Sequence, residues 1–192
     1  MLPSQVHGDL KGANVLIAGD GTPMLADFGS SSLRDTTLQF TRTDTQPGYS
    51  LRWTVGTLLL SDEYLNETMA FQAPEIIRGK SGNTTAGDVY SLGMTILEAF
   101  TAEVPFPKKS DTSLYGYIVI NKKRPHRPRE IIPERSVYGN ILGSILMGCW
   151  SYEPQLRPKA TTVWEALKPL TPDMLVEIEE AVDSDEEEEE ED

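Results

Sequence analysis

Residues 7–14 read His-Gly-Asp-Leu-Lys-Gly-Ala-Asn and residues 27–29 read Asp-Phe-Gly, and these two stretches decide the fold of this 192-residue chain. They contain a lysine, an amide and two carboxylates, Asp9 and Asp27. Phosphoryl transfer needs an acid that receives a hydroxyl proton and hard oxygen ligands for a metal ion. The pattern therefore indicates a site that holds a metal beside a nucleophile.

The segment between the two motifs predicts a β-hairpin. Two short apolar runs, 15–17 and 23–25, flank a turn that contains Gly19, Asp20 and Gly21. Glycines around an aspartate are typical of a hairpin turn. Asn14 enters this hairpin and Asp27 leaves it, so we expect the two to converge.

The rest of the chain reads as mostly helical. Thr84 begins a cap-like sequence, and apolar residues follow at helical spacing until Pro105 and Pro107, which should stop the helix. These apolar residues are Val89, Leu92, Ile96 and Phe100. Further helices fit at about 111–120, 137–149 and 160–168, whereas residues 30–50 read as a loop.

Together with three later motifs, these residues resemble the C-terminal lobe of a protein kinase catalytic domain. The later motifs are Ala73-Pro74-Glu75, Asp88-Val89-Tyr90-Ser91-Leu92-Gly93, and Cys149-Trp150 followed by Arg157-Pro158. The resemblance implies the α+β protein-kinase-like fold, here mainly its α-helical C-lobe with a small β-hairpin. We expect residues 1–170 to form this lobe and residues 171–192 an acidic, disordered tail.

The resemblance also implies roles for individual residues and a reaction, transfer of the γ-phosphoryl group of ATP to a protein hydroxyl. Asp9 would accept the hydroxyl proton, and Lys11 would offset charge on the phosphate. Asn14 and Asp27 would bind the nucleotide through Mg²⁺. Three further residues would be structural: Asp88, and Glu75 and Arg157, which would form a buried ion pair.

Two departures from the family pattern bear on activity. Gly8 stands where many kinases carry an arginine that grips a phosphorylated activation loop, which argues against that form of control. Only six residues precede His7, so we expect the N-terminal lobe (N-lobe), with its glycine-rich loop and ATP-binding lysine, to be missing. Kinase activity of this chain alone is then predicted to be weak or absent, because positioning supplies most of the catalysis.

A third departure interrupts the activation segment. Residues 52–54 read Arg-Trp-Thr, and eighteen residues, 55–72, separate them from Ala73. Removing this segment restores an uninterrupted family motif. Either 55–72 is a retained intron translated in frame, which we favour, or it is a genuine loop insertion.

Charge is concentrated at the C-terminus. The net charge is -13, but thirteen of the 30 acidic residues lie within 173–192, so the remainder is balanced by the 17 Lys and Arg. The tail is interpreted as a solvated segment, with a contact to a basic partner as the alternative. The basic stretch 122–129 lacks interleaved aromatic residues, which argues against nucleic acid.

No apolar run approaches the length of a membrane span, and Cys149 has no cysteine with which to pair. These features indicate a cytoplasmic or nuclear protein. Two functions remain open: a kinase acting on protein Ser/Thr or Tyr, with Ser/Thr favoured by Lys11, and a non-catalytic scaffold acting through its helical lobe and acidic tail.

Overall fold

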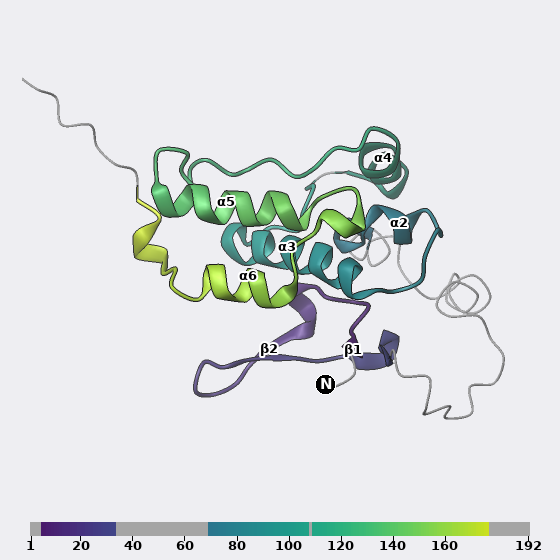
Figure 1. Cartoon of the computed structure of the whole chain (residues 1–192), viewed down its shortest axis with the longest axis horizontal. Coiled ribbons are helices and arrows are strands. Elements are labelled where there is room, and N and C mark those ends of the chain that lie inside the picture. The colour runs from purple at the N-terminus through teal and green to yellow at the C-terminus, as the bar shows by residue number, and fades with distance from the viewer. Residues whose placement is uncertain (1–4, 34–68, 108, 177–192) are drawn as a thin grey trace, which may run out of the picture.

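Helix α3 (Thr85–Thr101) is the central element of the protein. The computed structural model of the chain describes residues 5–33, 69–107 and 109–176 (Figure 1). The helix begins where the sequence predicts, because the Thr84 side chain accepts a hydrogen bond from the Gly87 N–H. It ends before the prolines: Ala102 is left-handed, with φ of 54°, and its N–H bonds the Glu98 carbonyl at 2.7 Å.

Two small antiparallel sheets lie at the N-terminal side of the described chain. Strand β1 (Gln5–Val6) pairs with β4 (Ser32–Leu33). Strand β2 (Val15–Ile17) pairs with β3 (Pro23–Leu25), with Val15 opposite Leu25. The predicted hairpin over 15–25 is therefore confirmed.

The remaining described elements are helical, as the sequence predicts. The α-helices besides α3 are α2 (Pro74–Ile77), α4 (Asp111–Leu114), α5 (Val137–Cys149) and α6 (Ala160–Leu167). Short turns are η1 (Gly12–Asn14), η2 (Phe28–Ser30), η5 (Pro154–Leu156) and η6 (Pro172–Met174). The helix predicted over 111–120 is only partly α-helical, because α4 continues into the wider π-helical turn η4 (Tyr115–Ile120).

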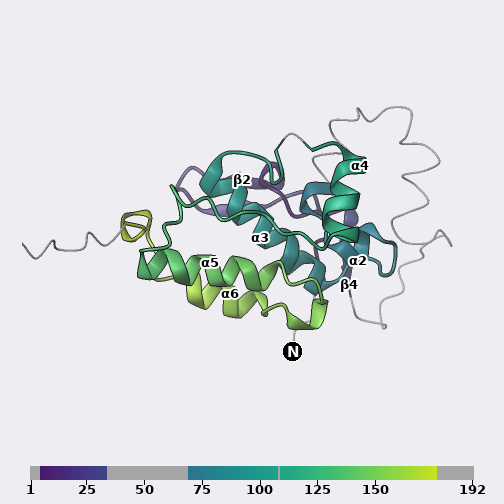
Figure 2. The same cartoon turned by 90° about the horizontal axis from the view of Figure 1, so that it is seen from above.

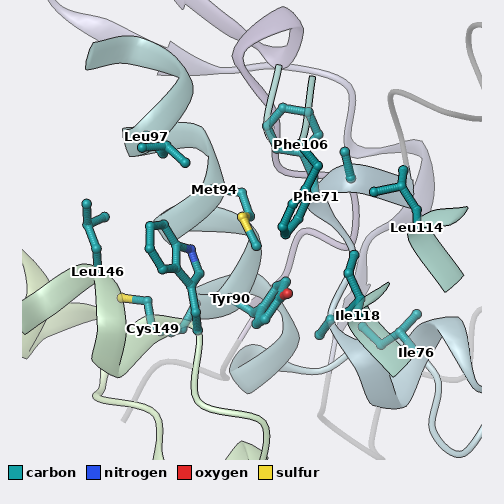
Figure 3. Packing of buried hydrophobic residues seen from close by; sticks show 14 of the residues in the cluster. Phe71, Ile76, Tyr90, Met94, Leu97, Phe106, Leu114, Ile118, Leu146 and Cys149 are labelled. Atoms are coloured by element: carbon teal, nitrogen blue, oxygen red, sulfur yellow. The ribbon is translucent and has the colours of Figure 1, made fainter. Parts of the chain in front are cut away.

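The core forms where α3 packs against α5, and α6 also packs against α5 (Figures 1 and 2). Figure 3 shows Tyr90 and Met94 of α3 between Leu146 and Cys149 on one side and Phe71 and Ile118 on the other. The helix buries residues on several faces, so it is apolar nearly all round apart from its two acids. None of the described helices is long and apolar enough to cross a membrane.

Several predictions fall outside the described residues. Most of the loop predicted over 30–50, residues 55–68 of the interrupting segment, and residues 177–192 of the tail predicted over 171–192 belong there. The first residues of that predicted tail are described and ordered as η6, because Ser136 holds the Met174 carbonyl at 3.3 Å.

Candidate active site

The loop of residues 7–14 is bound to α3 by the two charged residues of that helix, Asp88 and Glu98. The Asp88 carboxylate accepts hydrogen bonds from the backbone N–H of His7 at 2.8 Å and of Gly8 at 2.9 Å. Burial raises the pKa of the Asp88 carboxyl above its ordinary value, although the two N–H donors act in the opposite direction. Asp88 therefore acts on the loop across 80 residues of sequence.

Glu98 is a residue that the sequence interpretation missed. Its Oε2 accepts a hydrogen bond from the Gly12 N–H at 2.8 Å. A Cβ atom on Gly12 would lie 2.5 Å from the same oxygen, so the close approach depends on glycine. A single acid within the apolar second half of α3 is the signal that could have indicated a partner for Glu98.

Gly8 has a local structural reason to be glycine. Its φ is 84°, and a Cβ atom there would collide with the Asn83 side chain and approach the Ser30 carbonyl oxygen at 2.8 Å. This backbone conformation lets both the His7 and the Gly8 N–H reach Asp88. The absence of an arginine at position 8 is thus accompanied by packing that leaves no room for a side chain.

Three of the predicted site residues meet at the Asp9 carboxylate. Lys11 Nζ lies 3.4 Å from Asp9 Oδ2, and the Asn14 amide donates to Asp9 Oδ2 at 3.2 Å and to the Asp9 carbonyl at 2.7 Å. Lys11 and Asn14 are buried, with 5% and 8% of their surface exposed. Burial and pairing hold the Asp9 side chain in one orientation at the end of the loop.

His7 supports the loop from behind. Its Nε2 lies 2.9 Å from the Ala26 carbonyl, and its Nδ1 accepts the Asp9 N–H at 3.3 Å, so the proton belongs on Nε2. The ring also packs on Phe28, with centroids 4.8 Å apart. These contacts give His7 a structural role beneath the loop.

Asp27 comes near Asn14 through the backbone of the hairpin. The Ala26 N–H donates to the Asn14 carbonyl at 2.9 Å, which extends the β2–β3 pairing and places Asp27 one residue further. Asp27 is left-handed, with φ of 56°, and its carboxylate accepts the Gly29 N–H at 3.2 Å. No side-chain contact joins Asp27 to Asn14 here.

The donor set fits a hard cation in its chemistry. Because Asn14 uses its amide nitrogen on Asp9, its amide oxygen points away from that residue. An amide oxygen and an exposed carboxylate are the oxygen ligands that Mg²⁺ accepts beside phosphate and water. The described residues contain no cluster of three or more His, Cys, Asp or Glu that could hold a metal by itself.

Glu75 and Arg157 form the ion pair that the sequence predicts. Arg157 binds the two carboxylate oxygens with two N···O distances of 2.7 Å, and none of the arginine side chain is exposed. Arg157 also donates to the carbonyls of Ala86 and Ser151, each at 2.9 Å. The pair therefore links α2, the start of α3 and the segment after α5.

Two of the four described residues of the interrupting segment, Ala70 and Phe71, belong to the core, and Met69 packs against it. Ala70 and Phe71 have 1% and 3% of their surface exposed, and Ser91 Oγ donates to the Phe71 carbonyl at 2.8 Å. Figure 3 shows the Phe71 ring beside Phe106. The end of this segment is thus held by contacts immediately before Ala73.

Comparison with known proteins agrees with this geometry. The protein kinase domain family matches residues 4–167. Serine/threonine-protein kinase CTR1 of Arabidopsis thaliana is 29% identical over 168 residues, which is 88% of this chain and 17% of the relative. Dual specificity protein kinase shkE of Dictyostelium discoideum is 28% identical over 171 residues, 89% of this chain and 20% of the relative.

A third relative, the proto-oncogene serine/threonine-protein kinase mos of Mus musculus, is 29% identical over 166 residues, 86% of this chain and 42% of the relative. The chain therefore spans less than half the length of each of these proteins. The family match itself covers most of the chain. By its motifs, its fold and this match, the chain belongs to the protein kinase family.

Proposed function

We propose that this lobe supplies the catalytic residues of a protein kinase active site, with Asp9 as the proton acceptor. The observation that carries the proposal is the fixed Asp9 carboxylate, paired with Lys11 and Asn14 on a loop tied to α3. A substrate hydroxyl would give its proton to Asp9 as its oxygen bonds to the γ-phosphorus of ATP. The bond from that phosphorus to the bridging oxygen breaks, and ADP leaves.

The other site residues have electrostatic roles in this proposal. Lys11 lies within an ion-pair distance of Asp9 and would offset negative charge on the transferring phosphoryl group. Asn14 and Asp27 would hold Mg²⁺, which supplies charge neutralisation at the phosphate oxygens. Glu75, Arg157 and Asp88 would keep the surrounding segments in place and touch no reactant.

We propose a protein Ser/Thr hydroxyl as the substrate. Lys11 in the loop supports this choice, and relatives include proteins named as serine/threonine and as dual specificity kinases. A peptide library that offers Ser, Thr and Tyr acceptors would separate the two classes. Preferential labelling of Tyr peptides would contradict the proposal.

Full activity should require an N-lobe that covers ATP. The hairpin beside the site leaves large apolar side chains exposed on both of its faces, which a second lobe could cover in part. These residues are Leu16, Ile17, Met24 and Leu25, between 48% and 66% exposed. We therefore propose that residues 1–192, tested without such a lobe, bind ATP weakly.

The test compares the chain alone with the chain fused to the N-lobe of the mouse relative. We expect transfer from radiolabelled ATP to be roughly 100-fold or more lower for the chain alone. Asp9→Asn should abolish transfer in the fusion, whereas Asp20→Asn, in the exposed hairpin turn, should leave it unchanged. Equal, Asp9-dependent activity in both proteins would refute the weak-activity statement only.

The alternative function is a non-catalytic scaffold. The exposed apolar side chains of the hairpin and the acidic C-terminal sequence favour it, since both suit contacts with partners. If neither protein in the assay shows Asp9-dependent transfer, the enzymatic proposal is wrong and the scaffold stands.

We further propose that residues 55–72 arise from a retained intron. Deletion would bring Trp53 and Thr54 next to Ala73, so they would replace Phe71 and Gln72 against Ser91. Transcript sequencing tests this directly. Reads that consistently span the codons of 55–72 would show a genuine insertion instead.

A further inference from the structure

A pocket lies away from Asp9, at the C-terminal end of α3. It has a volume of about 390 Å³ and is lined mainly by apolar and proline side chains. We call it the α3–η4 groove and define it by six of its lining residues: Leu97, Thr101, Val104, Phe106, Tyr117 and Pro125. None of the residues proposed for phosphoryl transfer lines this groove.

The walls of the α3–η4 groove are held in place by their own contacts. The Phe106 and Tyr117 rings meet edge to face with centroids 5.5 Å apart, and Phe106 has a left-handed backbone with φ of 58°. The Lys123 N–H donates to the Tyr117 carbonyl at 3.0 Å, which ties the basic stretch 122–129 to this wall. The groove is therefore preformed, which lowers the entropic cost of filling it.

The rim of the groove carries more positive than negative charge. Lys109 lines the groove and lies 4.3 Å from the centre of the Tyr117 ring, and the exposed Lys123 is tied to the same wall by its backbone N–H. Lys122 points elsewhere, because its ammonium lies 4.5 Å from the centre of the Tyr152 ring. Glu103 is the acid among the lining residues. Two other cations of the stretch are already paired: Arg127 with the Ile132 carbonyl at 2.7 Å, and Arg129 with a glutamate at 3.1 Å.

We propose that the acidic C-terminal segment, residues 177–192, docks in the α3–η4 groove of its own chain. This segment contains twelve acidic residues and no Lys or Arg, and it includes the apolar residues Ile178 and Val182. Its charge complements the lysines of the rim, and its apolar residues suit the apolar lining. The remainder of the chain has 18 acidic residues against 17 Lys and Arg, so most of the net negative charge of the protein lies in this one segment.

The last described residues lie where the segment can reach the groove. Ser136 Oγ donates to the Met174 carbonyl at 3.3 Å, so the chain leaves beside the start of α5 (Figure 1). Arg127, in the wall segment 125–128, binds Asn140 in the first turn of α5 at 2.8 Å. Sixteen extended residues could span roughly 50 Å, which is ample for this path. Tethering also raises the effective concentration to about the millimolar range, so individually weak charge pairs suffice.

Docking would place the acidic segment next to the catalytic loop. Leu97 lines the groove, and its neighbour Glu98 binds Gly12 of the loop that carries Asp9. A docked segment would compete with any acidic protein segment that approaches Asp9 along this side. This consequence does not depend on the chain being active, and neither does the test below.

The test uses paramagnetic broadening in the full chain, with a nitroxide attached at Ser184→Cys. Cys149 will not compete for the label, since none of its surface is exposed and burial raises the pKa of its thiol to about 11. We expect the amide signals of Val104, Tyr117 and His126 to broaden, and that of Gly21 in the distant hairpin to stay sharp.

Variants decide whether charge holds the contact. Lys109→Glu with Lys123→Glu should remove most of the broadening, whereas Lys159→Glu with Lys168→Glu, the same change on exposed lysines near α6, should retain it. Glu186 to Glu191, all changed to Gln, should also remove it without altering any described residue. The proposal is overturned if the groove signals stay sharp, if the rim and tail variants leave broadening unchanged, or if broadening appears only between labelled and unlabelled copies.

Discussion

Replacing Arg157 by methionine tests the central structural claim, that the buried ion pair with Glu75 holds the activation-segment end to the lobe. The arginine side chain has no exposed surface, while the Glu75 side chain is 13% exposed. Removing the guanidinium strands a nearly buried carboxylate, which costs about 3–5 kcal/mol. The free energy of unfolding should fall by this amount.

The loss of stability in Arg157→Met has two parts, the stranded charge of Glu75 and the backbone carbonyls that lose their donor, and a double variant separates them. Adding Glu75→Gln to Arg157→Met removes the stranded charge but leaves the carbonyls of Ala86 and Ser151 without this donor. An unsatisfied buried acceptor costs about 1–3 kcal/mol. The double variant should therefore recover part, but not all, of the lost stability.

Urea unfolding followed by circular dichroism measures both effects. With a denaturant slope of about 2 kcal/mol per molar, Arg157→Met should lower the midpoint by about 2 M. The matched control is Arg129→Met, because Arg129 and Glu134 form an exposed pair, with 76% and 52% of the side chains accessible. That variant should cost less than about 1 kcal/mol. Equal losses for Arg157→Met and Arg129→Met would refute the reasoning.

Three other predictions concern the loop and its supports. Gly8→Ala should destabilise the protein more than Gly21→Ala in urea unfolding, because both have φ near 85° but only Gly8 is surrounded by close neighbours; equal losses would show that only backbone strain matters. Glu98→Ala should increase hydrogen exchange at the Gly12 amide, whereas Glu98→Gln keeps an acceptor and most of the protection; unchanged exchange in both would contradict the 2.8 Å bond. Carbon-13 NMR should show the Asp88 carboxyl titrating above 3.8. Because the folded state binds this proton more tightly, its contribution to stability is complete below pH 3.8 and is lost as the pH rises through the raised value; titration below 3.8 would be inconsistent with burial as the main cause.

Local sequence was sufficient for much of the secondary structure. Thr84 caps α3 as predicted, the turn around Asp20 joins the predicted hairpin, and α5 has the predicted bounds of 137–149. Such features depend on residues a few positions apart, so short-range patterns reveal them. The predicted end of α3 was wrong by a few residues, because a left-handed Ala102 stops the helix before Pro105.

In the candidate site too, local sequence was sufficient for some contacts and not for others. Asp9, Lys11 and Asn14 lie within six residues, and a single turn brings them together. Glu98 was missed because its partner Gly12 lies 86 residues away, and no local pattern shows that contact.

By itself, then, the sequence determined the family and the places where helices and the hairpin begin, and it supplied the proposal for the site residues. Only the tertiary structure decided what holds the loop: Asp88 and Glu98 reach it from a buried helix, and position 8 must be glycine because Asn83 occupies the space of a side chain. It also revealed the α3–η4 groove, whose walls come from three separate segments of the chain. The physical reason is range, since motifs and periodicity record interactions between near neighbours, whereas burial and long-distance hydrogen bonds arise only when remote segments pack together.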